Sequence, residues 1–88
     1  MSRRRIAIAG AGNMARVRGR AFLDTGRAEI CAVASQRSER AERCAAELGC
    51  DISSDDFRQL AEAKPDAVLI ETPHRVQDEI ALWALEAG

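Results

Sequence analysis

The chain has few of the residues that would mark a nucleic-acid-binding, disulfide-rich or membrane protein. Aromatic residues make up only 3% of its 88 positions, tyrosine is absent, and there are three cysteines and two prolines. Thirteen Lys and Arg residues are balanced by fourteen Asp and Glu residues, for a formal net charge of −1. Because the basic residues are spread along the chain without an aromatic platform, we expect no nucleic-acid partner. No apolar run is long enough to cross a membrane, so we expect no membrane association.

The three cysteines lack the spacings that indicate disulfides or a metal site. Cys31, Cys44 and Cys50 are odd in number, form no C-x-x-C pair and lie in apolar segments. This pattern is typical of reduced thiols in a protein core, and it predicts no metal site. The arginines near the start could open a twin-arginine export signal, but only the short apolar run 6–9 follows before a glycine. The sequence therefore predicts a cytoplasmic protein.

The length and composition predict one globular domain. A chain of 88 residues, 47% hydrophobic and 31% charged, has the balance of a folded protein. At this size only about 60% of the unfolded surface is buried on folding, so there is room for a single small core.

The most informative stretch is a glycine turn near the start. The apolar run 6–9 leads into Gly10 and Gly12, and Ala15 completes a G-x-G-x-x-A spacing typical of a dinucleotide-binding βαβ unit. There the first glycine permits the turn, the second lets a pyrophosphate approach, and the third small residue lets helix and strand pack closely. Free N–H groups at the helix start, around Asn13 and Met14, would hold the phosphate charge. The alternative is a turn that needs small residues only for its own packing.

Apolar segments and helical patterns alternate along the rest of the chain. Strands are expected over residues 6–9, 28–35 and 66–72, with a brief extended segment at 50–52. Helices are expected over 13–24, from an N-cap at Ser38 to a C′ residue at Gly49, around 57–61, and from His74 onward. This alternation predicts an α/β fold, a doubly wound, Rossmann-like parallel sheet of about four main strands with helices on both faces.

The spacing of apolar residues also predicts which helix faces are buried. The stripe of the first helix consists of Met14, Val17, Ala21 and Phe22. The stripe of the short helix consists of Phe57, Leu60 and Ala61, and that of the last helix of Val76, Ile80, Trp83, Ala84 and Ala87.

The second predicted strand ends in residues that favour NADP as the cofactor. Units that prefer NAD usually place an acid there to bind the ribose 2′-hydroxyl, whereas this chain has Ser35 and Gln36. Ser35 can donate a hydrogen bond, and Arg37 and Arg40 can supply charge-assisted ones to a 2′-phosphate. NAD remains possible. The alternative is that both arginines are solvated at a helix start, with a neighbouring Arg43–Glu39 pair at i, i+4.

The segment after the last predicted strand should face the middle of the dinucleotide, towards the nicotinamide. Thr72, Pro73, His74 and Gln77 are the candidates there. His74 either has a structural role or transfers a proton, since its ordinary pKa suits that chemistry. Glu71 ends a buried strand, so it either lines the ligand crevice or caps a neighbouring backbone donor.

These residues together carry a family resemblance. Segments 5–15, 33–35, 66–74 and 81–88 resemble, in that order, the nucleotide-binding domain of the Gfo/Idh/MocA oxidoreductases. The resemblance implies NAD(P)-dependent hydride transfer at a hydroxyl or carbonyl carbon of a sugar, polyol or related small molecule. It also implies a second α/β domain that supplies the substrate site and a surface for homo-oligomer formation.

The chain departs from the family pattern at several positions. Family members often have His at the position of Arg18, Asn at that of His74 and His at that of Gln77. Their NADP-binding members tend to read Ala-Ser-Arg after the second strand, whereas in this chain Gln36 stands between Ser35 and Arg37. Their catalytic lysine belongs to a later segment that nothing here matches. We therefore expect residues 1–88 to form an incomplete dinucleotide-binding domain with no catalytic residue, the substrate domain lying outside this sequence.

Two other functions compete with this interpretation. A non-catalytic sensor or scaffold module could bind the same dinucleotide through the same turn. A methyltransferase that binds S-adenosylmethionine uses a similar glycine turn but normally has an acid after the second strand, which Ser35-Gln36-Arg37 does not provide.

Overall fold

The strands form one parallel sheet in the order expected of a doubly wound fold. The computed structural model describes residues 3–72 and 74–87, and the side chains of all of these except 74–76 and 87. The strands are β1 (Arg4–Ala9), β2 (Ala28–Ala34), β3 (Ser53–Ser54) and β4 (Ala67–Ile70). The helices are α1 (Asn13–Asp24), α2 (Ser38–Glu47), the 3₁₀-helix η1 (Phe57–Ala63) and α3 (His74–Ala87). The four-stranded sheet has the order β3-β2-β1-β4 with parallel pairs throughout, which confirms the predicted fold class.

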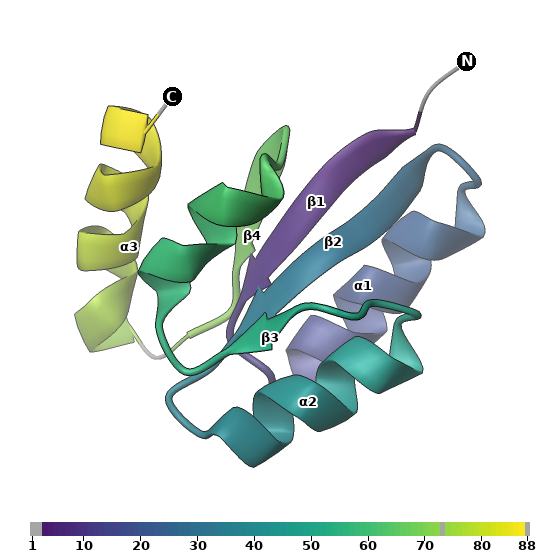
Figure 1. Cartoon of the computed structure of the whole chain (residues 1–88), viewed down its shortest axis with the longest axis horizontal. Helices are drawn as coiled ribbons and strands as arrows, with labels where there is room; N and C mark the ends of the chain where they lie inside the picture. The colour runs from purple at the N-terminus through teal and green to yellow at the C-terminus, as the bar shows by residue number, and fades with distance from the viewer. Residues whose placement is uncertain (1–2, 73, 88) are drawn as a thin grey trace.

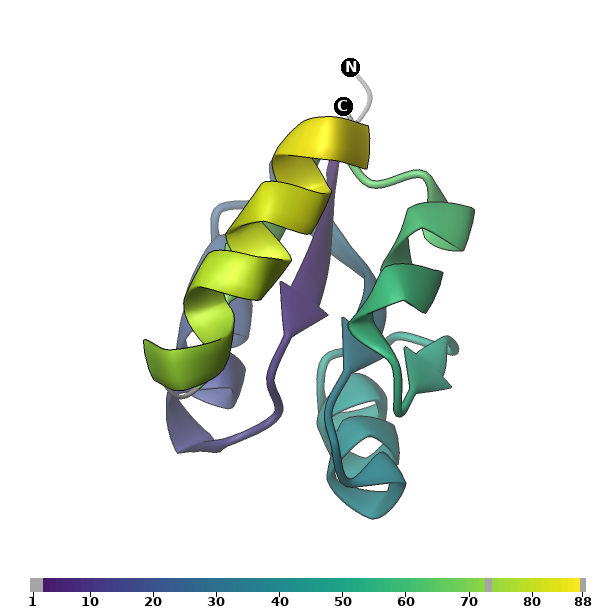
Figure 2. The ribbon, with the colours of Figure 1, turned by 90° about the vertical axis from the view of Figure 1, so that its left-hand side faces the viewer.

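Helices cover both faces of the sheet (Figures 1 and 2), with α1 and α2 on one side and η1 and α3 on the other. Alternate residues of β1 point to the two layers because side chains along a strand alternate between faces. Ile8 packs with α1 and α2, whereas Ala7 packs with η1 and α3, and both are 0% exposed. β1 is therefore the buried central strand, and its lack of polar alternation follows from having no solvent-facing side.

The buried face of α1 differs from the predicted one. The four apolar residues of the predicted stripe are all exposed: Met14, Val17, Ala21 and Phe22. The helix instead buries Ala15 and Gly19. A Cβ on Gly19 would lie only 2.7 Å from Leu48 Cδ1, so α1 approaches its neighbours through its smallest residues. A stripe defined by large apolar residues misses a contact made through small ones.

The start of α2 is also shifted from the prediction. Ser38 is the first helical residue, and Arg37 is the N-cap, with no side-chain capping hydrogen bond. The predicted end is confirmed, because Gly49 follows the helix with a φ of +73°, the left-handed conformation of a C′ residue.

The short helix η1 begins as predicted but turns differently. Asp56 caps it, its Oδ1 accepting a hydrogen bond from Arg58 N at 3.0 Å. The tighter 3₁₀ winding buries Leu60 and Ala63 and leaves Ala61 exposed, contrary to the predicted stripe. The pairing segment before it is Ser53–Ser54, just beyond the predicted 50–52.

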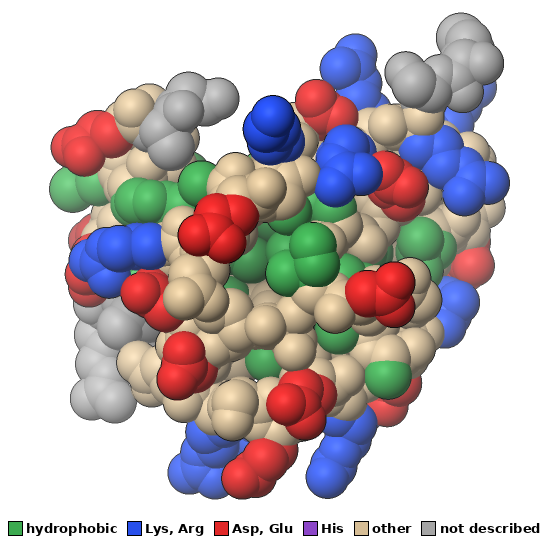
Figure 3. Space-filling model, in the orientation of Figure 1, with side chains coloured by type: hydrophobic (Ala, Val, Ile, Leu, Met, Phe, Trp, Pro, Cys, Tyr) green, Lys and Arg blue, Asp and Glu red, His purple; other side chains and the backbone are tan. Residues whose placement is uncertain are grey.

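The three cysteines are free and buried, as predicted. Burial raises the pKa of each thiol, which keeps it protonated. In the described part of the chain, no helix is long and apolar enough to span a membrane. Figure 3 shows acidic and basic side chains interspersed over one face of the molecule, in keeping with the balanced composition.

Candidate functional site

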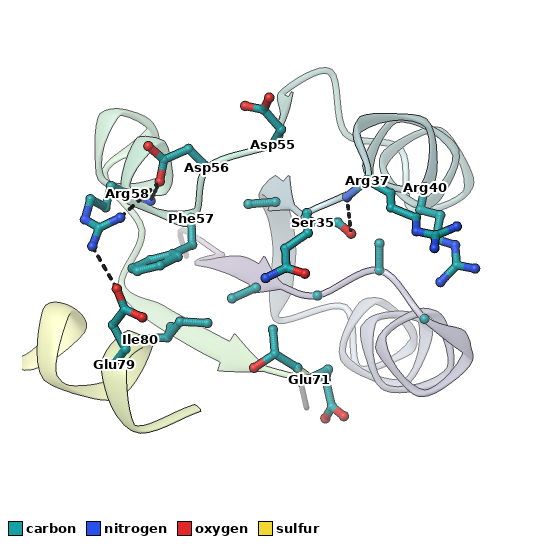
Figure 4. A pocket seen from close by; sticks show the side chains of 17 residues that line it. Ser35, Arg37, Arg40, Asp55, Asp56, Phe57, Arg58, Glu71, Glu79 and Ile80 are labelled. Carbon is teal, nitrogen blue, oxygen red and sulfur yellow. Dashed lines mark hydrogen bonds and ion pairs between the residues drawn. The ribbon is translucent and has the colours of Figure 1, made fainter. Parts of the chain in front are cut away.

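The carboxyl ends of all four strands lie level at one edge of the sheet. The registers align Ala9 with Ala34 and Ile70, and Ala34 with Ser54. The residues that follow these strand ends therefore gather around a cavity of about 500 Å³ (Figure 4). Its wall consists of Ala9–Gly12, Ala34–Arg37, Arg40, Asp55–Arg58, Glu71, Thr72, Glu79 and Ile80. This is the position in which open α/β sheets bind their ligands.

Gly10 is required by the backbone of the chain itself. Its φ is +116°, and a Cβ there would lie 2.7 Å from the carbonyl carbon of Glu71 and 3.3 Å from the nitrogen of Thr72. Its own N–H donates to Ala34 O at 2.7 Å. The absence of a side chain at Gly10 therefore lets the backbone at the end of β1 lie directly against the backbone of the turn after β4. This close contact requires glycine in addition to the turn itself.

Gly12, in contrast, has no such requirement. Its φ of −80° is open to any residue, and beyond its two chain neighbours a Cβ there would meet no atom of the described part of the chain within 4 Å. The packing of the described residues thus explains the glycine at position 10 but not the one at position 12. The missing side chain at Gly12 instead leaves free space beside the cavity.

The start of α1 offers unpaired donors at the same place. Gly12 is the N-cap and makes no side-chain capping bond, and the first turn contains no acidic residue. The first N–H groups of a helix have no partner within the helix, and they lie at the positive end of its dipole. Ala15 is 0% exposed, so this helix start is held tightly against the sheet. Such a terminus is suited to an anionic group.

A smaller cavity of about 210 Å³ adjoins the glycine turn. It is lined by Ala11, Gly12, Asn13, Arg16, Arg40, Arg43 and Cys44. Asn13, predicted to lie by the pyrophosphate, belongs to this cavity. The side chain of Met14 lines neither cavity and is 48% exposed.

The end of β2 brings the predicted ribose group together. Ser35, Gln36, Arg37 and Arg40 all line the larger cavity. Ser35 Oγ accepts a hydrogen bond from Arg37 N at 3.3 Å, so its own hydroxyl proton is not used in that bond. Among the described residues, no ion pair includes Arg37, Arg40 or Arg43, so the alternative pair between Arg43 and Glu39 does not form.

Glu71, at the end of β4, lines the larger cavity and has its partner on α1. Its Oε1 lies 3.1 Å from Arg18 Nε, and its side chain is only 14% exposed. The side chain of Arg18 remains 55% exposed while making this pair. Of the two roles left open by the sequence, Glu71 takes the position in the crevice.

The turn between β4 and α3 contains an unpaired polar atom. Thr72 Oγ1 is buried and has no hydrogen-bond partner among the described residues, although Thr72 lines the cavity. Gln77 Nε2 donates to Thr72 O at 2.7 Å and so holds the turn rather than lining the cavity. Pro73 and the side chain of His74 lie outside the described residues.

The cavity wall opposite Arg37 and Arg40 consists of residues that were not predicted as site residues from the sequence. Asp55, Asp56, Phe57 and Arg58 line the cavity together with Glu79 of α3. Arg58 bridges η1 and α3, with Nη2 at 2.9 Å from Glu79 Oε1 and Nη1 at 3.7 Å from Asp56 Oδ1 (Figure 4). The sequence does contain a signal for this wall, because Asp55 directly follows β3, but the extended segment predicted at 50–52 ends before that position.

Phe57 fixes this wall through two aromatic contacts. The Arg58 guanidinium lies 4.6 Å from the centre of the Phe57 ring. Trp83 of α3 meets the same ring edge-on at a centroid distance of 5.3 Å. On the η1 side the cavity wall therefore combines Phe57 with acidic residues and the ion-paired Arg58, whereas Arg37 and Arg40 on the α2 side form no ion pair within the described part of the chain.

Known proteins resemble this chain in sequence and in fold. The chain is 37% identical over 62 residues to inositol 2-dehydrogenase 4 from Saccharopolyspora erythraea, a match that covers 69% of this chain and 18% of that protein. An NAD binding oxidoreductase from Klebsiella pneumoniae superposes with a TM-score of 0.89 at 29% identity, covering 99% of this chain and 26% of that one. A scyllo-inositol dehydrogenase from Lactobacillus casei, with bound NAD(H) and scyllo-inositol, has a TM-score of 0.87 at 25% identity, covering 99% and 26%.

The chain spans about a fifth to a quarter of the length of these relatives. The model of the oxidoreductase family with the NAD-binding Rossmann fold matches residues 4–88, which is nearly all of the sequence. The glycine turn, the strand order and the cavity at the strand ends are what such a fold requires. The chain belongs to the Gfo/Idh/MocA oxidoreductase family, and residues 4–88 match the NAD-binding Rossmann fold of that family.

Proposed function

We propose that the cavity binds a nicotinamide adenine dinucleotide and prefers NADP to NAD. The observation that carries the binding site is Gly12, where a side chain would enter free space and not the protein. A pyrophosphate beside this glycine could reach the unpaired N–H groups that begin α1. The unpaired hydroxyl of Thr72 fits a polar ligand in the same cavity.

The residues proposed to hold the dinucleotide fall into three groups along the edge of the sheet. Those for the pyrophosphate are Gly10, Gly12, Asn13 and Met14, the last through its backbone at the helix start. Those for the adenosine ribose are Ser35, Gln36, Arg37 and Arg40. Those towards the nicotinamide are Thr72, Pro73, His74 and Gln77, the last by holding the turn at Thr72.

The preference for NADP rests on charge at the end of β2. Arg37 and Arg40 form no ion pair among the described residues, so both guanidinium groups are free to meet a phosphate. The first acidic residues after β2 that line the cavity are Asp55 and Asp56. They lie across the cavity from the two arginines, on the η1 side (Figure 4).

For the whole protein we propose hydride transfer at a hydroxyl or carbonyl carbon of a polyol, a sugar or a related small molecule. The inositol dehydrogenases among the relatives support this substrate class. The bound dinucleotide supplies the hydride chemistry, and the residues of this chain bind and orient it. The catalytic residues, the substrate domain and a homo-oligomer surface belong to other parts of the protein. The three free, buried thiols support a reducing compartment such as the cytoplasm.

A comparison of the two cofactors tests the proposal. NADPH and NADH are titrated by calorimetry against the protein, against Arg37→Ala, and against Arg27→Ala as an exposed control outside both cavities. We expect tighter binding of NADPH, and a loss of about 1.5–3 kcal/mol for NADPH alone in Arg37→Ala. Equal affinities in the parent protein would remove the NADP preference, and the absence of binding would remove the site. Binding without turnover of polyols or sugars by the whole protein would favour the sensor alternative.

A further inference from the structure

We propose that the outward face of α1 is an interface on which the substrate domain of the whole protein docks, beside the dinucleotide cavity. This face consists of Met14, Val17 and Ala21, and we call it the outer stripe. The inference rests on the proposed function and adds to it a contact surface between two domains of the same polypeptide. The occupant of the outer stripe is an apolar surface of the substrate domain.

The outer stripe has the pattern of a buried helix face but is open to solvent. Its three residues recur at i, i+3 and i+7, so they lie on one side of α1. Met14 is 48% and Val17 is 53% exposed, and Ala21 is exposed as well. The opposite side of the helix packs on the sheet through Ala15 and Gly19. A surface helix normally turns its larger apolar residues to the core. The reversed arrangement in α1 is explained by a second partner on its outward side.

The position of the outer stripe relates it to the substrate domain. Gly12 lines both cavities, and Met14 follows it within the first turn of α1. The helices on this side of the sheet are α1 and α2, so within the described part of the chain α1 has a helix on one flank only (Figures 1 and 2). Hydride transfer requires the substrate to lie against the dinucleotide. A domain that holds the substrate at the cavity therefore stands next to the start of α1.

The charges around the outer stripe favour an apolar partner over an acidic one. Arg16 Nη1 lies 3.0 Å from Glu47 Oε1, and Arg20 Nη2 donates to the backbone oxygen of the same residue at 2.7 Å. Arg18 Nε lies 3.1 Å from Glu71 Oε1. An acidic surface would have to compete with these contacts for the three arginines. Apolar side chains between paired charges are typical of a surface that another protein surface covers.

The size of the face favours a linked domain over a second copy of the chain. At about 1.5 Å per residue and about 10 Å across, the 12 residues of α1 present a face of roughly 200 Å². A stable complex of separate chains buries about 800 Å² on each partner. Domains of one polypeptide need less area, because their linkage gives a high effective concentration. This chain covers only 18% of one relative and 26% of another, so those proteins contain residues enough for a further domain.

The test measures whether the outer stripe is covered in the whole protein. Two variants each place a cysteine at an exposed alanine, Ala21→Cys on the outer stripe and Ala46→Cys on α2, outside both cavities. The folded proteins are treated with a maleimide, and labelling of each peptide is followed by mass spectrometry. We expect Ala21→Cys to react about tenfold more slowly than Ala46→Cys, since thiol reactivity requires access to the reagent. In urea the two rates should be equal.

A second variant tests whether the apolar contact causes this protection. Val17→Glu is combined with Ala21→Cys and places a charge within the outer stripe. A charge buried against an apolar surface without a partner is unfavourable, so the contact should open. We expect the cysteine at position 21 to react at the rate of Ala46→Cys, while NADPH binds with the parent affinity. Protection that persists in this double variant would overturn the apolar contact.

Three further outcomes separate the possible explanations. If Ala21→Cys reacts as fast as Ala46→Cys in a protein that binds NADPH, the outer stripe is free, and this inference is overturned while the dinucleotide function stands. If the parent binds neither NADH nor NADPH, the proposed function fails and this inference fails with it. If the protection disappears on dilution to a monomer, as measured by light scattering, a second copy covers the outer stripe and the assignment to the substrate domain is wrong.

Discussion

Arg18 Nε lies 3.1 Å from Glu71 Oε1, so an ion pair joins the middle of α1 to the end of β4. The Glu71 side chain is 14% exposed, and a carboxylate that leaves water to this extent needs a compensating partner. Arg18 provides it from α1, the helix that follows the glycine turn. The ion pair therefore links two turns that line the cavity, the one after β1 and the one after β4.

We predict a measurable coupling between these two residues. Arg18→Ala should lower the free energy of unfolding by about 1 kcal/mol, because the arginine is half exposed and solvent screens the pair. Glu71→Gln removes the unpaired charge, so the double variant should be less destabilised than the sum of the single variants. Urea denaturation of the four proteins gives the coupling energy. A coupling indistinguishable from zero would mean that the pair contributes nothing to stability.

The aromatic contact on the η1 side should contribute more to stability than an exposed aromatic residue. Phe57→Ala removes the edge-on contact with Trp83 and the Arg58 contact, and should cost about 2 kcal/mol. Trp83 is the single tryptophan of the chain, so its fluorescence should shift to longer wavelength in the same variant. Phe22→Ala is the matched control, since Phe22 is 39% exposed on α1. Equal losses in the two variants would refute the packing described for this wall.

The buried thiols should make stability depend on alkaline pH. Burial raises the pKa of Cys44 above its ordinary value of 9.0, and the charge of Glu47 acts in the same direction. The unfolded chain therefore loses this proton first, so the free energy of unfolding should fall as the pH rises above 9.0. No tyrosine titrates in that range. Cys44→Ala should reduce the pH dependence in denaturation experiments between neutral and alkaline pH, and an unchanged slope would count against a buried neutral thiol.

The two glycines of the turn should respond differently to the same substitution. Gly10→Ala should lower the free energy of unfolding by about 3 kcal/mol, because the φ of +116° and the Glu71 backbone both oppose a Cβ. Gly12→Ala should change it by no more than about 1 kcal/mol, the scale of a helix-cap preference. Thermal or chemical denaturation of both variants makes the comparison, and similar losses would contradict the roles assigned to them.

The sequence predicted the sheet and the glycine turn because these depend on local patterns. Strands buried on both faces are continuous apolar runs, and the G-x-G-x-x-A spacing marks the turn whatever surrounds it. The buried face of α1 was predicted wrongly because Gly19 contributes no hydrophobicity, although its lack of a side chain is what brings Leu48 close. A helix face that packs closely because it carries a glycine is not recognised by a search for large apolar residues at helical spacing.

The candidate site was predictable where it depends on strand ends and not where it depends on tertiary pairing. The position of Ser35 after a strand predicted its place at the cavity, and the same rule applied to Asp55 would have found the opposite wall. The partner of Glu71 could not be predicted, because Arg18 is distant in the sequence and only the packing of α1 brings it near. The smaller cavity likewise arises from two helices, and no single segment contains it.

The most direct test of the account is the effect of Gly12→Val on dinucleotide binding. The side chain would occupy the free space beside the glycine turn, so calorimetric titration should show that NADPH and NADH no longer bind. Circular dichroism should remain that of the parent, because no atom of the described residues, apart from Gly12 and its two chain neighbours, lies within 4 Å of the added Cβ. Ala21→Val places the same side chain on an exposed part of α1 and should bind both cofactors normally. If Gly12→Val folds and still binds either dinucleotide with the parent affinity, the glycine turn is not the binding site.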